Sequence, residues 1–200
     1  MAFFVIEGDN GTGKDTVASK FIEDGFEIVT YDKKIRTMEN LAKKEVGKNR
    51  VLKFMAYNKA ESDLIKEKRN YKNVLLIRYF VSTLAAGYAD GIFAYKDTID
   101  ILKNTYPKFE KPDAIIRLKC DYQERVNRIE NRNSKDDDDK TYRRNVRYRW
   151  ITDKIKENIN LNWIDIDTSN KSIAQIYTEI KNSINNIITR NDINIDIEKE

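Results

Sequence analysis

The 200-residue sequence predicts an α/β fold in which a five-stranded parallel sheet is flanked by helices. Short apolar runs alternate with longer segments of helical periodicity, as expected when helices connect parallel strands. The first of these runs, AFFVIEG, is continuously apolar up to its last two residues, which is typical of a strand buried on both faces. The first of them ends in a glycine-rich turn that leads directly into a helix. In such a sheet, ligands bind at the carboxyl ends of the strands.

The first half of the chain contains three of the expected strands. They are the runs AFFVIEG, FEIVTYD and NVLLIRY, at residues 2–8, 26–32 and 73–79. A helix is expected over residues 13–22, with Val17, Ala18 and Phe21 on one face. Residues from about 34 to 70 have helical spacing and predict two helices broken near Gly47. Helical segments continue after the third strand to about Thr105.

The second half supplies the other two strands, PDAIIRLKCD at residues 112–121 and NWIDID at residues 162–167. Helices are expected from Tyr122 to about Asn131 and over residues 141–160, the latter with Trp150 and three isoleucines facing inward. The charged run NSKDDDDK between them predicts an exposed loop. Residues 171–188 form a strongly amphipathic segment, and the polar residues 191–200 are expected to fray. Residues 1–190 are therefore interpreted as one domain with a short tail.

Composition excludes several classes of site. The chain has no histidine, which rules out Ser-His-Asp and Cys-His catalysis and histidine zinc sites. Its one cysteine, Cys120, lies in an apolar run and is expected to be buried. The net charge of +4 is too small to indicate nucleic acid as a partner. No apolar run is long enough to span a membrane and no leader is recognisable, so a cytoplasmic setting without membrane contact is expected.

The turn after the first strand has the pattern of a phosphate-binding loop. The residues expected to bind ATP are Gly8, Asp9, Asn10, Gly11, Thr12, Gly13, Lys14, Asp15 and Thr16. Glycines at three of these positions let backbone N–H groups turn toward phosphate oxygens, and the following helix adds a positive dipole. Lys14 is predicted to contact the β- and γ-phosphates as a catalytic residue.

Asp15 departs from this pattern, which has Ser or Thr directly after the lysine. That hydroxyl normally binds Mg²⁺, the metal expected to accompany ATP. Two alternatives remain open. Asp15 binds the metal itself, or it points away from the phosphates while Thr16 contacts one of them.

With this loop, four further segments resemble the thymidylate kinase family of nucleoside monophosphate kinases over about residues 3–185. EGDNGTGKDT resembles the family's E-G-x-D-G-x-G-K-[ST]-T, and LKFMAYN its L-L-F-x-A-x-R. IRYFVSTLAAG resembles D-R-Y-x-x-S-x-x-A-Y-Q, and NVRYRW resembles V-R-x-x-Y. KPDAIIRLKCDYQERVNRIENR resembles a strand, a helix and the start of an arginine-bearing lid at about 131–141. The resemblance implies a three-layer P-loop kinase fold, a homodimer, and phosphoryl transfer from ATP to a nucleoside monophosphate.

The resemblance also implies roles for residues outside the loop. Arg78 would hold the acceptor phosphate, with Ser82 nearby, and Phe54 would stack on the acceptor base. Arg128 and Arg132 would begin the lid over ATP, Arg132 as a catalytic residue. From its helical spacing, Phe54 fits a core aromatic equally well. From the residues alone, six arginines are interpreted as mostly solvated helix charges, of which one or two reach the phosphates: Arg125, Arg128, Arg132, Arg143, Arg144 and Arg147.

Several acceptor-side positions differ from the family pattern. Asn10 and Ile77 replace two aspartates, Asn58 replaces the arginine after L-L-F, and Ala86–Gly87 replace Tyr-Gln. We therefore treat dTMP as the leading acceptor and keep two alternatives. Asp32 follows the second strand, where deoxynucleoside kinases have a carboxylate base, so a deoxynucleoside kinase is the second hypothesis. A degenerate, non-catalytic nucleotide-binding protein is the third.

Overall fold

The computed structural model describes residues 1–131 and 141–197, and side chains as far as Arg190. The strands are β1 (Phe3–Gly8), β2 (Glu27–Ile28), β3 (Val74–Ile77), β4 (Ala114–Lys119) and β5 (Trp163–Asp167). The helices are α1 (Lys14–Lys20), α2 (Lys33–Lys43), α3 (Gly47–Lys68), α4 (Phe80–Ala89), α5 (Tyr95–Thr105), α6 (Tyr122–Glu130), α7 (Tyr142–Asn158) and α8 (Ile173–Ile197), with 3₁₀ turns η1 (Val29–Tyr31) and η2 (Tyr106–Lys108).

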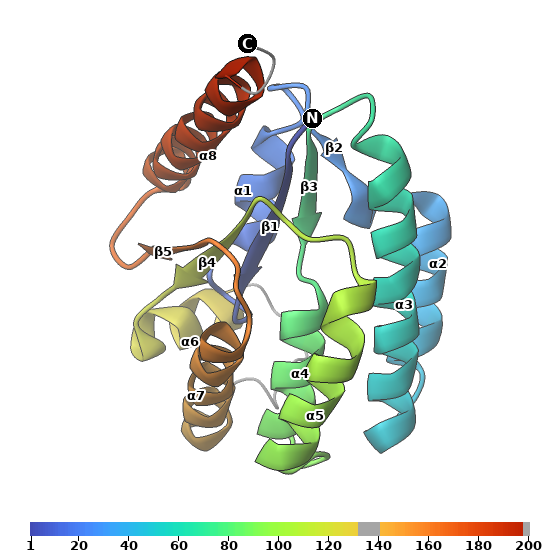
Figure 1. Cartoon of the computed structure of the whole chain (residues 1–200). Helices are drawn as coiled ribbons and strands as arrows, with labels where there is room; N and C mark the ends of the chain where they lie inside the picture. Colours follow the sequence, from blue (N-terminus) through green and yellow to red (C-terminus); the bar gives the residue numbers. More distant parts are fainter. Residues whose placement is uncertain (132–140, 198–200) are drawn as a thin grey trace.

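The five strands form one parallel sheet with the order β2-β3-β1-β4-β5 (Figure 1), which confirms the predicted fold class. β1 is the central strand and pairs with β3 on one side and β4 on the other. Strands β2 and β3 lie on one side of β1, and β4 and β5 lie on the other. The order in which the chain adds strands to the sheet therefore reverses at β1. The loop after β1 therefore lies at the switch point, where open α/β sheets bind ligands.

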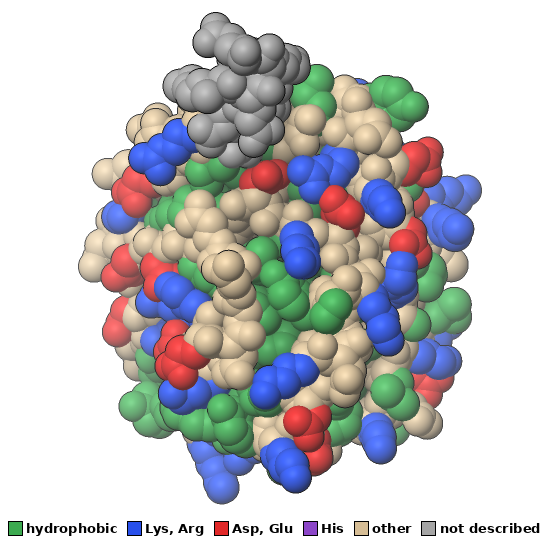
Figure 2. Space-filling model, in the orientation of Figure 1, with side chains coloured by type: hydrophobic (Ala, Val, Ile, Leu, Met, Phe, Trp, Pro, Cys, Tyr) green, Lys and Arg blue, Asp and Glu red, His purple; other side chains and the backbone are tan. Residues whose placement is uncertain are grey.

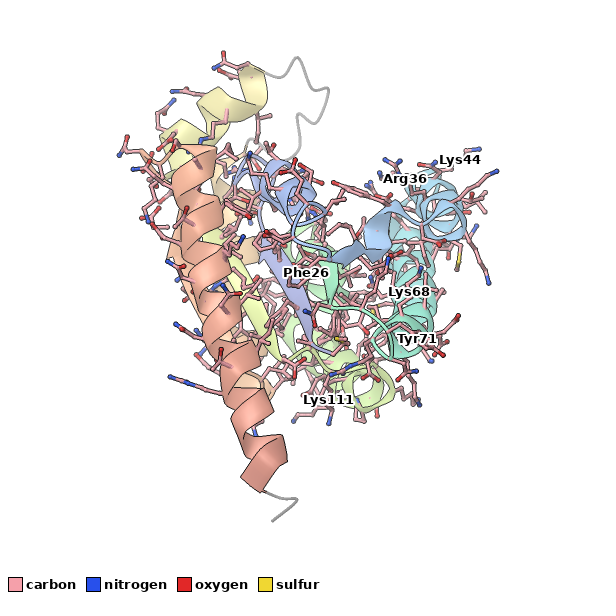
Figure 3. All side chains as sticks on the ribbon, turned by 90° about the horizontal axis from the view of Figure 1, so that it is seen from above. Phe26, Arg36, Lys44, Lys68, Tyr71 and Lys111 are labelled. Atoms are coloured by element: carbon pink, nitrogen blue, oxygen red, sulfur yellow. The ribbon has the colours of Figure 1, made fainter. Side chains whose placement is uncertain are left out.

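Alternate residues of the strands pack into cores on opposite faces of the sheet. Phe3 and Val5 of β1 belong to the core beneath α3, α4, α5 and α7. Phe4 and Ile6 belong to the core beneath α1 and α8. This follows from the two-residue period of a strand and makes the sheet the middle of three layers. Seen from above (Figure 3), α8 lies along one side of the molecule, while Arg36 and Lys44 mark α2 on the other.

Three local predictions were wrong. The second strand covers only Glu27–Ile28, because it is an edge strand paired with β3 alone and the chain then turns into η1. Trp150 is 41% exposed and stacks on Tyr88 of α4, with ring centroids 5.4 Å apart, instead of entering the core. The backbone of α8 continues to Ile197, so residues 191–197 are helical where fraying was expected.

The surface carries interleaved positive and negative side chains on the face drawn in Figure 2. Cys120 is buried at 2% exposure, as predicted. The NSKDDDDK loop and most of the predicted lid lie outside the described residues. Among the helices that are described, none combines the length and apolar character needed to cross a membrane.

Candidate active site

The glycine loop between β1 and α1 has the backbone conformation that its sequence predicts. Gly8, Gly11 and Gly13 all have positive φ, at 147°, 84° and 88°. Side chains at two of these positions would also collide with the neighbouring structure. A Cβ on Gly8 would lie 2.6 Å from the carbonyl oxygen of Leu118, and one on Gly11 would lie 2.9 Å from the carbonyl oxygen of Arg125. The loop therefore packs directly against β4 and α6, and only glycine fits there.

Lys14, the first residue of α1, is only 3% exposed and lies beneath this loop. Its Nζ donates a hydrogen bond of 3.1 Å to the backbone carbonyl of Asp9. Burial lowers the pKa of Lys14 to about 7, and the Arg78 guanidinium acts in the same direction. A carboxylate oxygen of Asp15 lies 3.9 Å from this Nζ. The partners of the buried Lys14 ammonium stabilise its charge only weakly. A polyphosphate bound beside it would therefore stabilise the charged form strongly.

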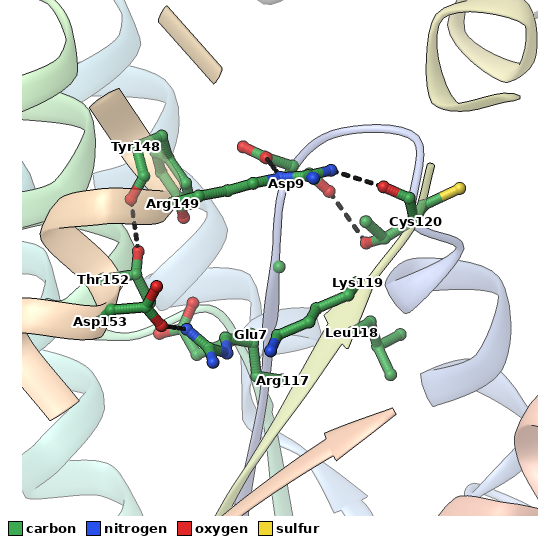
Figure 4. Close-up of a pocket in the computed structure, with 12 residues that line it drawn as sticks. Glu7, Asp9, Arg117, Leu118, Lys119, Cys120, Tyr148, Arg149, Thr152 and Asp153 are labelled. Atoms are coloured by element: carbon green, nitrogen blue, oxygen red, sulfur yellow. Dashed lines mark hydrogen bonds and ion pairs between the residues drawn. The ribbon is translucent and has the colours of Figure 1, made fainter. Parts of the chain in front are cut away.

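Asp9 connects this loop to α7, a contact that the sequence analysis missed. The Asp9 side chain is 6% exposed, and its Oδ2 lies 3.7 Å from Nε of Arg149. Arg149 also donates to the carbonyl oxygen of Cys120 at the end of β4 (Figure 4). Burial raises the pKa of Asp9, and four arginines, Arg125 and Arg149 foremost, oppose that rise. Arg149 therefore spans from α7 to the carboxyl ends of β1 and β4.

A cavity of about 220 Å³ opens between these strand ends and the middle of α7. Its walls include Glu7, Asp9 and Thr12 from β1 and the loop, and Tyr148 and Arg149 from α7 (Figure 4). Charged side chains of both signs line it. The cavity extends the site from the glycine loop toward α7.

Arg78 follows β3 directly, as predicted, and lies beside the glycine loop. It adopts a left-handed conformation with φ of 66°, and its guanidinium donates to the side chain of Asn10. Such a strained backbone at a residue with a Cβ is typical of functional positions. The charge of Arg78 also acts on Glu7, lowering its pKa against the larger upward effect of burial. The charged partner that a buried-strand arginine requires is therefore present.

Glu7, at 1% exposure, organises the residues behind Arg78. It accepts a 2.9 Å hydrogen bond from the backbone N–H of Tyr79 and another from the hydroxyl of Ser82. The Ser82 hydroxyl lies 3.0 Å from that of Tyr148 on α7. Ser82 therefore joins β1, α4 and α7 in a buried network.

Two arginines of α6, Arg125 and Arg128, form hydrogen bonds that hold neighbouring segments in place. Arg125, which was interpreted as mostly solvated, is fully buried and donates a 3.0 Å hydrogen bond to the carbonyl oxygen of Asn10. It therefore supports the glycine loop from below. Arg128 donates to the backbone and side-chain oxygens of Thr168, at 2.8 and 3.2 Å, and pairs with Glu124. It joins α6 to the segment after β5. Arg132 lies outside the described residues.

The arginines of α7 differ in their exposure and in their partners. Arg143 is exposed, as interpreted. Arg144 pairs with Asp90, with Nε 2.6 Å from its Oδ1. The Arg147 guanidinium lies 4.7 Å from the centre of the Tyr88 ring and donates to the carbonyl oxygen of Tyr88 at 2.6 Å. Arg147 and Arg144 therefore fasten α7 to α4, whereas Arg149 of the same helix contacts Asp9 of the loop.

The remaining predicted acceptor residues, besides Arg78 and Ser82, lie on α3 and at the start of α2. Phe54 is partly buried against the core and meets Tyr57 edge to face, with centroids 5.9 Å apart. Asn58 is 2% exposed and bonds to Glu61 and Thr83. Asp32 caps α2, its Oδ1 accepting from Lys34 N at 2.9 Å and Ile35 N at 3.3 Å. Asp32 thus has a helix-capping role.

The arrangement concentrates positive charge beside a loop of glycines. Lys14, Arg78 and Arg149 surround the loop, and Arg125 supports it. Such a site can bind a polyphosphate and neutralise charge that moves between oxygens, which is the chemistry of phosphoryl transfer. Arg125 lies one turn before Ile129, on the apolar face of α6. A charged residue at such a position is a sequence signal that could have identified Arg125 as buried.

Comparisons with known proteins relate the chain distantly to probable thymidylate kinases. No protein-family model matches the chain. It is 28% identical over 195 residues to a probable thymidylate kinase of Methanococcus maripaludis, covering 91% of this chain and 94% of that protein. It is 24% identical over 192 residues to a probable thymidylate kinase of Methanocaldococcus jannaschii, covering 92% and 96%.

Solved structures with the same fold include two kinds of nucleoside-related kinase. Thymidylate kinase from Candida albicans superposes with a TM-score of 0.70 at 18% identity, covering 92% of this chain and 91% of that one. Deoxyadenosine kinase from M. mycoides with bound dATP superposes with a TM-score of 0.62 at 18% identity, covering 92% and 99%. The chain is therefore a distant homologue of the probable thymidylate kinases and has the fold that thymidylate and deoxynucleoside kinases share.

Proposed function

We propose that this chain is an ATP-dependent kinase that phosphorylates a (deoxy)nucleoside monophosphate to the diphosphate, with dTMP as the leading candidate. The observation that carries the proposal is the glycine loop, which buries Lys14 beside Arg78 at the switch point of the sheet. The full-length relation to probable thymidylate kinases supports it. A homodimer, which the family resemblance implies, stays an expectation.

In this proposal, the loop amides and Lys14 bind the β- and γ-phosphates of ATP, and Arg78 binds the acceptor phosphate. A phosphate oxygen of the acceptor attacks the γ-phosphorus, and the bond to the bridging oxygen of ADP breaks. The acceptor phosphate is already anionic, so the step needs no strong base. Arg149 is half-exposed and lies 3.7 Å from Asp9, so its guanidinium is placed to turn toward the phosphates.

Mg²⁺ bound with ATP supplies further charge neutralisation. Hard cations of this kind take one or two carboxylates together with phosphate oxygens. The Asp15 carboxylate is 67% exposed at the start of α1 and 3.9 Å from Lys14, so its oxygens fit this role. No group of three or more acidic or cysteine side chains within residues 1–131 and 141–190 could hold a metal alone.

The second candidate is a deoxynucleoside kinase with Asp32 as base. It is favoured by the position of Asp32 after β2 and η1, and by the shared fold of deoxyadenosine kinase from M. mycoides. Against it stands the use of Asp32 Oδ1 as the cap of α2. The third candidate, a non-catalytic nucleotide-binding protein, predicts ATP binding without turnover.

An ADP-release assay across deoxynucleosides and their monophosphates tests these functions. We expect turnover with monophosphates and little with nucleosides. Asp32→Asn separates the first two candidates, because asparagine caps a helix about as well as aspartate but cannot act as a base. Activity within a few-fold of the parent is expected for a monophosphate kinase. A loss of about a hundredfold or more would assign Asp32 as the base.

The matched variant Asp32→Ala removes both the cap and the carboxylate. It is expected to lower stability by about 1 kcal/mol, which thermal unfolding would detect. Turnover on no acceptor, together with tight ATP binding, would contradict the kinase proposal and favour the third candidate.

A further inference from the structure

Asp9 contacts two cations of the site through different atoms. Its backbone carbonyl accepts the 3.1 Å hydrogen bond from Nζ of Lys14, and its carboxylate Oδ2 lies 3.7 Å from Nε of Arg149. The hydroxyl of Thr12 donates to the same carbonyl at 2.9 Å, which helps to fix Asp9 within the loop. Lys14 and Arg149 therefore meet the same residue of the glycine loop, and a phosphate group that binds to Lys14 lies near Arg149 as well.

The two cations differ in their freedom to move. The side chain of Lys14 is 3% exposed, whereas that of Arg149 is 45% exposed and projects from α7 across the strand ends (Figure 4). Arg149 and Asp9 both line the cavity of about 220 Å³, so there is open space beside the guanidinium. Arg149 is therefore the cation that can adjust to the length of a bound polyphosphate.

The contacts of Arg149 use one edge of its guanidinium. Nε faces the carboxylate of Asp9, and Nη2 donates to the carbonyl oxygen of Cys120. Nη1 takes part in neither contact. A guanidinium carries five N–H donors in a planar fork that matches phosphate oxygens. Arg149 can therefore bind a phosphate oxygen through Nη1 while Asp9 still holds its Nε.

The family pattern that the chain resembles specifies neither residue of this pair. Asp9 stands at the first x of E-G-x-D-G-x-G-K, and Arg149 stands at the second x of V-R-x-x-Y. A buried carboxylate in the loop would repel a polyphosphate unless a cation accompanied it. Arg149 offsets the charge of Asp9 and also brings further N–H donors to the loop. The pair is therefore compatible with a triphosphate beside it.

Resting on the proposed function, we propose that Arg149, positioned by Asp9, binds the γ-phosphate of ATP and gives the donor site a preference for ATP over ADP. Arg149 is a catalytic residue in this inference because it touches the transferred group, and Asp9 is a positioning residue that acts through it. ADP ends at the β-phosphate, which Lys14 and the loop amides bind. Arg149 then stays with Asp9 and Cys120 and adds little to the binding of ADP.

Calorimetric binding of Mg·ATP and Mg·ADP to the parent and to Arg149→Ala tests this inference. We expect the ATP affinity of the variant to fall by about tenfold or more, as is typical when a charged hydrogen bond is lost. Its ADP affinity should stay within about threefold of the parent. Arg143→Ala is the matched control, because Arg143 is an exposed arginine of the same helix and the net charge changes equally. It should leave both affinities close to those of the parent.

Asp9→Asn keeps the shape of the side chain and removes the charge that holds Arg149. It should lower the ratio of ATP affinity to ADP affinity several-fold in the parent background. It should leave this ratio unchanged when Arg149 is already alanine, because the two residues act through one contact. An equal change of the ratio in both backgrounds would contradict the positioning role of Asp9.

Arg149 is half-exposed, so its variants should fold, and they provide the test if the variant of the buried Asp9 does not. An Arg149→Ala variant with the parent's ratio of ATP affinity to ADP affinity overturns the inference, even if the parent is an active kinase. A parent protein that binds ADP as tightly as ATP overturns it as well. A preference for ATP that is lost in Arg149→Ala, in a protein that turns over no acceptor, supports the inference and contradicts the proposed function.

Discussion

Lys14→Ala is expected to lower kcat/KM by about a thousandfold, the largest effect of any single change in the site. Lys14 is the buried cation of the glycine loop, and its ammonium group has the Asp9 carbonyl and the distant Asp15 carboxylate as neighbours. It is therefore placed to bind phosphate oxygens as charge moves between them. The measurement is ADP release with a saturating acceptor.

Lys20→Ala is the matched control, since Lys20 is an exposed lysine in the last turn of the same helix. It should leave turnover and thermal stability close to those of the parent. If the Lys14→Ala variant kept its activity within about tenfold of the parent, the phosphates would have to bind elsewhere. The roles assigned to the residues around the loop would then have no basis.

The same lysine predicts proton uptake when ATP binds. Its pKa is lowered to about 7 in the free protein by burial, so above that pH it is mostly neutral. The negative phosphates favour the charged form, so ATP binding at pH about 8 should take up close to one proton. Calorimetry in buffers of different ionisation heat measures this uptake. Lys14→Ala should lack it, and equal uptake in both proteins would contradict the assignment.

The elements that the sequence predicted correctly are those fixed by local patterns. The glycines of the loop and the apolar run of β1 are contiguous, and they specify a strand, a turn and a helix without reference to the remaining chain. The second strand was predicted too long because its length depends on pairing with β3 alone, which periodicity does not encode.

The errors in the site have one physical origin, since burial of a polar side chain depends on distant partners. Arg125 was interpreted as mostly solvated, but it lies beneath a loop more than a hundred residues away and donates to the carbonyl of Asn10. Arg149 was missed because its partners are the Asp9 side chain and the Cys120 carbonyl, on two different strand ends. The sequence of α7 contains no pattern that indicates the contacts of Arg149. The sequence of α6 indicates the contact of Arg125 only through the position of this arginine on the apolar face.

The contact between Arg125 and the loop leads to the second large prediction. Gly11→Ala is expected to lower kcat/KM by about a hundredfold and to destabilise the fold. Gly11 has φ of 84°, and a Cβ there would lie 2.9 Å from both Cγ and the carbonyl oxygen of Arg125 and 3.0 Å from Cγ1 of Ile129. The carbonyl oxygen belongs to the backbone of α6, so the loop must move. A displacement of about 1 Å can cost a factor of about 100 in rate.

Gly25→Ala separates this clash from backbone strain. Gly25 has the same φ of 84°, but a Cβ there would have no heavy atom within 4 Å. Left-handed strain alone costs about 1–2 kcal/mol in either variant, and overpacking adds about 1–3 kcal/mol for Gly11→Ala alone. Urea unfolding should therefore rank Gly11→Ala below Gly25→Ala, and ATP binding should weaken in the former only. Equal stability and equal ATP affinity in the two variants would mean that α6 yields to the added methyl, and that Arg125 does not fix the position of the loop.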